Sequence, residues 1–134
     1  MIELDVDDSS GRGLPYARVR EVVDLVLGSE LGDGRSNSSV HVGVHFVDAA
    51  RIKDLNRNFR SKDAPTDALS FPVDGAIEVS GPRELGDVLI CPALCTSQVE
   101  GLVHGLLHLL GYDHEVDAGE MLDRQDQLLV QLGG

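Results

Sequence analysis

The sequence predicts an α+β protein in which helices pack on a small mixed sheet. Apolar residues alternate with polar ones over residues 2–7 and again over 40–46, the period-two pattern of half-buried strands. Over residues 19–26 the apolar side chains instead recur every three or four positions, which places them on one face of a helix. Because strand and helix patterns follow one another along a single short chain, helices packed on one sheet are the expected arrangement.

Each later segment also carries a local signal. Pro15 is suited to begin the first helix and Gly28 is a plausible end, with residues 28–39 read as a loop because they are rich in Gly, Ser, Asp and Asn. Asp48 is a good N-cap for a second helix. Residues 61–66 break that helix, since Pro65 disfavours a helical conformation before it.

The second half of the chain continues in the same way. Residues 68–73 are expected to form a strand, with Pro72 marking its end or an edge position. The apolar run 88–91 indicates a strand covered on both faces. Pro92 is expected to start a helical stretch that runs into the histidine-rich segment, and Asp117-x-x-Glu120 is a capping box for a last helix through Leu129.

Length and composition predict one domain, residues 1–134, in the cytoplasm. The first residues carry neither a basic nor an apolar leader pattern, and no apolar run is long enough to cross a membrane. Cys91 and Cys95 are expected to stay reduced. The net charge of −12 opposes nucleic acid, yet five of the eleven basic residues fall within 51–62. Three of these lie on one helical face (Lys53, Arg57, Arg60) and could face a polyanion or only solvent.

The most informative segment holds three of the five histidines, in the pattern His-x3-His-x2-Gly-x2-His. His104 and His108 are four apart and so share one face of a helix, and a positive φ at Gly111 would let the chain turn back to bring His114 to the same ion. Three imidazoles leave a zinc ion one open position, which is typical of catalytic sites. His41 and His45, in contrast, are interpreted as structural residues of a strand.

This spacing is that of the long zincin signature with one difference. The glutamate that serves those proteases as general base is replaced here by Gly105. The pattern therefore keeps the metal ligands and lacks the base of the protease.

The segment GLLHLLGYDH (105–114) closely resembles the signature of the YbeY family, bacterial rRNA maturation factors described as single-strand-specific endoribonucleases. LNRNFRSKDAPTDALSFP (55–72) and LGDVLI (85–90) match the family in the same order. The resemblance implies a zincin-like α+β fold with a four-stranded mixed sheet and a zinc ion or similar divalent metal. It also implies a role in 16S rRNA 3′-end maturation and ribosome quality control. The partners would be single-stranded rRNA, the small ribosomal subunit and its assembly factors, with no DNA and no membrane.

By the same resemblance, Arg60 is the candidate catalytic residue, because it matches an arginine that is regarded as functional in the family. Asp67 and Asp113 could orient a ligand histidine. The segment between the 88–91 strand and the histidine helix is shorter than in the family, which leaves the anchoring of that helix open. Two alternatives stay open as well: a zinc metalloprotease, and a metal-binding ribosome assembly factor without enzymatic activity.

Overall fold

The computed structural model describes residues 2–31, 40–60, 68–72, 83–111 and 119–133. In chain order the elements are β1 (Ile2–Asp8), α1 (Tyr16–Leu31), β2 (Val40–Phe46), α2 (Ala49–Arg60), β3 (Ala68–Pro72), β4 (Arg83–Ile90), the 3-10 turn η1 (Pro92–Leu94), α3 (Gln98–Leu109) and α4 (Glu120–Gln131).

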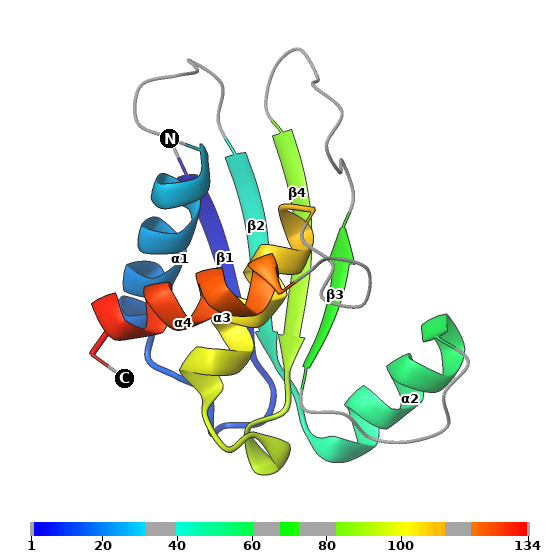
Figure 1. Cartoon of the computed structure of the whole chain (residues 1–134). Coiled ribbons are helices and arrows are strands. Elements are labelled where there is room, and N and C mark those ends of the chain that lie inside the picture. The colour runs from blue at the N-terminus through cyan, green and yellow to red at the C-terminus, as the bar shows by residue number, and fades with distance from the viewer. Residues whose placement is uncertain (1, 32–39, 61–67, 73–82, 112–118, 134) are drawn as a thin grey trace.

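The described strands form one sheet in the order β1-β2-β4-β3. β1 pairs with β2, and β2 with β4, in parallel, whereas β3 runs antiparallel to β4. The predicted α+β class with a four-stranded mixed sheet is thus confirmed (Figure 1). None of the helices in the described segments combines the length and apolarity needed to cross a membrane.

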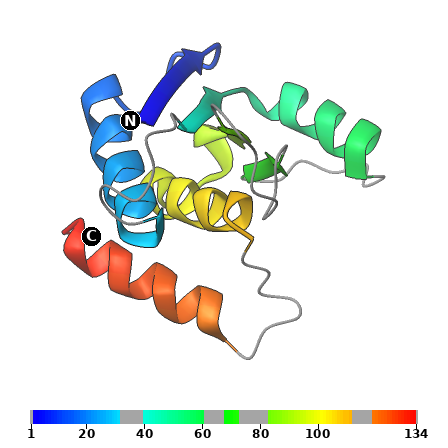
Figure 2. The ribbon, with the colours of Figure 1, turned by 90° about the horizontal axis from the view of Figure 1, so that it is seen from above.

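One face of the sheet is covered by α1 and α3, and α4 packs against α3 on the side away from the sheet, as the view from above shows (Figure 2). The inward side chains of β1, β2 and β4 meet those of the three helices in the main hydrophobic core. The alternation seen in the sequence is the cause, because every second side chain of a strand points to the same face. On β4, for example, Val88 and Ile90 belong to this core and the intervening Leu89 does not.

The opposite face is divided between an apolar and a polar half. Leu89 joins Leu69 of β3 and Ile52 of α2 in a second, smaller core, so α2 covers the β3–β4 end of this face. β4 is therefore covered on both faces, as its apolar run predicted. The strand prediction for 68–73 is confirmed for β3, while Val73 lies outside the described residues.

Three predicted helix boundaries are wrong. The last helix is not opened by the Asp117-x-x-Glu120 capping box: its N-cap is Gly119, with no side-chain hydrogen bond at the cap, and the helix ends at Gln131 rather than Leu129. The first helix does not end at Gly28 but continues to Leu31. The φ of Gly28 is not positive, so this glycine does not adopt the left-handed conformation that ends many helices. The helical stretch from Pro92 does not run into the histidine helix either. It is a short 3-10 turn, and α3 starts separately with Ser97 as its N-cap.

His41 and His45 of β2 lie on the polar half, facing away from the main core. Nε2 of His41 is 2.6 Å from Oδ2 of Asp5 on β1, and its Nδ1 is 2.7 Å from Oε1 of Glu84 on β4. Nε2 of His45 lies 2.9 Å from Oδ1 of Asp87. Gly43 leaves the room for this second contact, since a Cβ there would lie 2.3 Å from the same Asp87 oxygen. Both histidines thus link neighbouring strands, in agreement with a structural role.

The hydrogen bonds to Asp5 and then to Glu84 raise the pKa of His41. The folded protein therefore favours protonated His41, and this contribution to stability is complete below about pH 6.5, the ordinary pKa of histidine. It is lost as the pH rises through the raised pKa of the folded state.

We expect the free energy of unfolding of the wild type to exceed that of His41→Gln most clearly near pH 6, with the difference shrinking towards pH 9. Urea unfolding of both proteins across this pH range measures the difference in the free energy of unfolding. Titratable side chains that both proteins share cancel in that difference. A difference that grows with pH would contradict the assignment.

Candidate metal centre

Helix α3 carries the first two predicted ligands. Two hydrogen bonds fix its N-terminal turn. Oγ of Ser97 accepts a hydrogen bond of 3.2 Å from the Glu100 amide, and Nε2 of Gln98 donates to the carbonyl of Arg12 at 3.1 Å. The short connection from β4 therefore does not leave α3 without an anchor. Gly101, Gly105 and the apolar side chains of α3 from Leu102 onwards are buried, whereas His104 and His108 are half-buried.

The two imidazoles converge as the i, i+4 spacing predicts. Their Nε2 atoms lie 3.2 Å apart, and the ring centroids are 4.7 Å apart with the rings inclined at 74°. Two nitrogen ligands of one tetrahedral zinc ion, each at about 2.0–2.1 Å, lie about 3.3 Å apart. The separation of the two nitrogens therefore matches that of two ligands of one ion.

The hydrogen bond of His104 also suits metal binding through Nε2. Its Nδ1 is 2.7 Å from Oε1 of Gln125 on α4. A carbonyl oxygen only accepts, so with the amide in this orientation a neutral His104 would carry its proton on Nδ1 and present a lone pair at Nε2. Metal-binding histidines commonly have their second ring nitrogen hydrogen-bonded in this way.

The turn after α3 also has the predicted conformation. Gly111 has a φ of 105°, and its amide donates to the carbonyl of His108 at 3.1 Å. His114 and Asp113 lie outside the described residues, as does Asp67. Within the described part of the chain no three His, Cys, Asp or Glu side chains meet in a metal-binding group, so the three-histidine site stays a prediction.

Gly105 explains why no glutamate follows His104. A Cβ at this position would lie 2.6 Å from Cγ1 and 3.2 Å from Cγ2 of Val88 on β4. The Gly105 carbonyl also accepts a hydrogen bond of 3.3 Å from Oγ of Ser70 on β3. The side of α3 at Gly105 therefore lies close against the sheet, and a side chain there would have to displace Val88.

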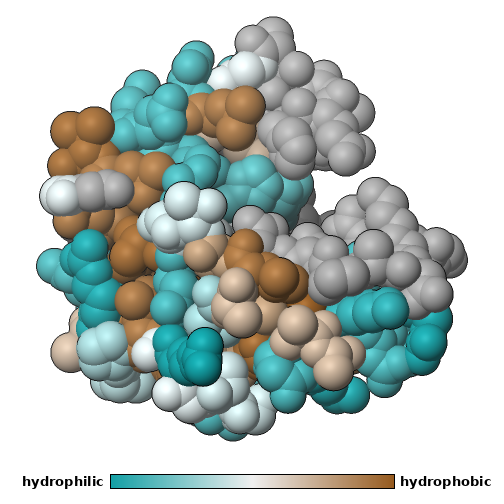
Figure 3. Space-filling model, turned by 90° about the horizontal axis from the view of Figure 1, so that it is seen from below, coloured by the Kyte–Doolittle hydropathy of each residue, from teal (hydrophilic) through white to brown (hydrophobic). Residues whose placement is uncertain are grey.

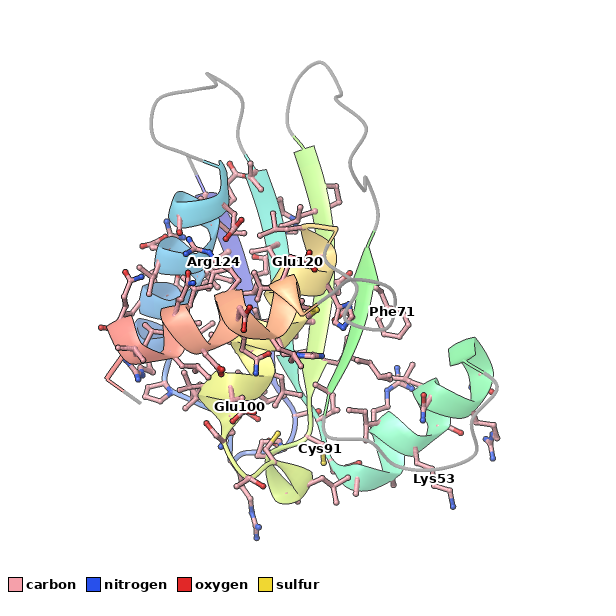
Figure 4. All side chains as sticks on the ribbon, viewed as in Figure 1. Lys53, Phe71, Cys91, Glu100, Glu120 and Arg124 are labelled. Carbon is pink, nitrogen blue, oxygen red and sulfur yellow. The ribbon has the colours of Figure 1, made fainter. Side chains whose placement is uncertain are left out.

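Helix α2 carries the predicted basic face. Asp48 caps it by accepting a hydrogen bond of 2.8 Å from the Arg51 amide, as expected. Lys53 and Arg57 are exposed, Lys53 points away from the molecule (Figure 4), and the described surface where α2 lies is largely hydrophilic (Figure 3). Arg57 forms an ion pair with Asp54 in the same helix, which partly neutralises the positive charge of Arg57. Arg60 is the last residue of α2, and its side chain lies outside the described residues.

Sequence reasoning missed Gln125. It is one of two buried polar side chains in the described segments, only 6% exposed. The signal was present, because Met121, Gln125 and Leu128 follow the i, i+4, i+7 spacing of one helix face. A glutamine among residues that face the core indicates a partner inside the protein.

Fold and site together define an α+β protein whose late helix presents two histidines suited to one metal ion. Comparison with known proteins then gives the family. A family model described as Endoribonuclease YbeY matches residues 6–133, so the chain belongs to the YbeY endoribonuclease family.

Individual relatives agree. Endoribonuclease YbeY of Bacillus cereus is 38% identical, over 86% of this chain and 85% of the relative. The protein of the same name from Staphylococcus aureus is 32% identical, over 99% of this chain and 97% of the relative. The solution structure of TM1509 from Thermotoga maritima is similar with a TM-score of 0.56 and 31% identity, covering 96% of this chain and 87% of that one.

The close approach at Gly105 predicts opposite effects for two Gly→Ala substitutions in helices. Alanine gains about 1 kcal/mol of helix propensity at either position, but at position 105 it must also displace the stiff Val88 side chain, an overpacking that costs about 1–3 kcal/mol. We expect Gly105→Ala to be less stable than Gly28→Ala by about 1–3 kcal/mol, measured by urea unfolding. Equal stability of the two variants would show that α3 can move away from the sheet.

Proposed function

We propose that this protein is a metal-dependent, single-strand-specific endoribonuclease of the cytoplasm that processes rRNA near the 3′ end of 16S rRNA and takes part in ribosome quality control. Its partners would be the small ribosomal subunit and its assembly factors. The observation that carries the proposal is the 3.2 Å approach of the His104 and His108 Nε2 atoms in a chain that belongs to a family of endoribonucleases.

The proposed metal is one zinc ion or a similar divalent ion, held by His104, His108 and His114. When bound by neutral imidazoles alone, such an ion keeps its double positive charge and acts as a Lewis acid towards a phosphoryl oxygen. The contact between Nδ1 of His104 and Oε1 of Gln125 favours the tautomer that binds through Nε2. We propose that the fold is zincin-like, on the basis of this ligand pattern alone.

The net charge of −12 opposes RNA binding, but part of it lies away from the histidines. In the described residues of β1 and β4, acidic side chains lie on the sheet face away from α3 (Glu3, Asp5, Asp7, Glu84, Asp87). The histidines project from α3 on the other side of the sheet, so these carboxylates are separated from them by the main core. Helix α2 lies on the same side of the sheet as these carboxylates, and we propose that Arg60, its last residue, donates two parallel hydrogen bonds to a phosphate.

The protease alternative has no support from the geometry. The general base of a zincin follows the first histidine, and this chain has Gly105 there, where any side chain would have to displace Val88. An assembly factor without catalysis differs in its response to metal removal, which would unfold the chain and leave no cleavage at any metal loading.

Replacing His108 tests the metal centre. We expect His108→Ala to lose most of its bound zinc, because one of three ligands is removed, and to lose cleavage of a single-stranded RNA that spans the 16S 3′ end. Elemental analysis and gel electrophoresis of the RNA, with and without a chelator, measure the two effects. His45→Ala on the opposite face is the matched control and should retain both. Unchanged metal content in His108→Ala would rule out the proposed site.

Arg60→Lys tests the proposed phosphate contact. Lysine keeps the positive charge but lacks the planar fork that binds a phosphate through two hydrogen bonds, so activity should fall well below wild type while fold and metal content persist. Arg51→Lys, an exposed position on the same helix, serves as the control. If both variants cleave RNA like the wild type, Arg60 is an ordinary surface residue.

A further inference from the structure

We infer that Gln125 is a positioning residue of the metal centre, which holds His104 in the one tautomer that can bind an ion through Nε2. This inference rests on the proposed metal site and adds to it a residue from another helix. Gln125 lies 21 positions beyond His104 in the chain, and its Oε1 is 2.7 Å from the Nδ1 of that histidine.

Because Gln125 is buried, its side-chain amide needs a hydrogen-bond partner inside the protein. Met121 and Leu128, one turn before and about one turn after it on α4, are fully buried in the main core. Gln125 itself is only 6% exposed. Burying an amide without a hydrogen bond is costly, and an apolar side chain would pack in this row without that cost. The amide is therefore useful at this position only through its hydrogen bond.

The orientation of the amide decides which ring nitrogen of His104 is available. With Oε1 facing Nδ1, the proton is on Nδ1 and the lone pair of Nε2 faces His108. The reverse orientation would place an N–H donor against Nδ1 and the proton on Nε2, where it would block an ion. A free histidine side chain prefers the Nε2–H tautomer, so His104 needs a partner that reverses this preference.

A neutral acceptor differs from a carboxylate in one respect. Glutamine fixes the proton without adding negative charge beside the ion, whereas a carboxylate would fix the same proton more strongly and also attract the cation. Glutamate at position 125 should therefore replace glutamine in function, and leucine should not. Leucine is of similar size and leaves Nδ1 of His104 without this acceptor.

The experiment compares wild type with Gln125→Leu, Gln125→Glu and, as a matched control, Gln131→Leu at an exposed position on the same helix. Two quantities are measured: the zinc dissociation constant, by competition with a chromogenic chelator, and the tautomer of His104 in the metal-free protein, by NMR of its labelled imidazole ring. His104→Asn identifies the resonances of that ring, and circular dichroism shows that each variant is folded.

We expect zinc to bind Gln125→Leu about 10–100-fold more weakly, with the His104 proton moved from Nδ1 to Nε2. Gln125→Glu should restore the Nδ1–H tautomer and bind zinc at least as tightly as the wild type, and Gln131→Leu should match the wild type in both measurements.

Three results would overturn the inference: zinc affinity of Gln125→Leu within about twofold of wild type, an Nδ1–H tautomer that persists in that variant, or an Nε2–H tautomer in the wild type itself. The last measurement needs no variant to fold. If the wild type binds no zinc at all, the proposed function fails, while the tautomer of the metal-free protein still shows whether Gln125 positions His104.

Discussion

The close contact between α3 and the sheet at Gly105 determines much of the rest of the structure. Because position 105 has no Cβ, the helix backbone approaches Val88, and Ser70 reaches the Gly105 carbonyl from β3. With this side of α3 pressed on β3 and β4, the neighbouring helix faces are left for α1 and α4, which complete the main core. With glycine directly after His104, any chemistry at this site proceeds without a base at that position.

The C-terminal helix contributes more than apolar cover. α4 packs its buried row against α3 and places Gln125 against His104, while Arg124 pairs with Glu30 of α1 at 2.5 Å. These contacts fix the position of α4 relative to both helices. The orientation of a candidate ligand on α3 therefore depends on a helix that follows it by a separate segment of the chain.

The two faces of the sheet serve different purposes. The face covered by α1 and α3 is apolar and carries the candidate metal centre, whereas the polar half of the other face collects carboxylates that His41 and His45 link across three strands. Paired with histidines, these carboxylates repel one another less than they would alone, which lets β1 carry an acidic residue at every second position. Part of the protein's negative charge therefore lies on the sheet face away from the histidines, whereas α3 and α4 carry Glu100, Glu120, Asp123 and Asp126.

The sequence alone determined the features that depend on local periodicity. The alternation in β1 and β2, the convergence of His104 and His108 at i, i+4, the Asp48 cap and the positive φ of Gly111 all follow from contacts within a few residues, and all are found in the structure. The tertiary structure alone decided the features that depend on space. Local sequence does not distinguish the glycines at positions 28 and 105. In the structure Gly28 has open space around its Cβ position, whereas Gly105 lies against Val88. The contact of Gln125 with His104 likewise forms only when α4 packs on α3. It could not be predicted from the sequence, because a hydrogen bond between residues 21 positions apart has no signature in local spacing.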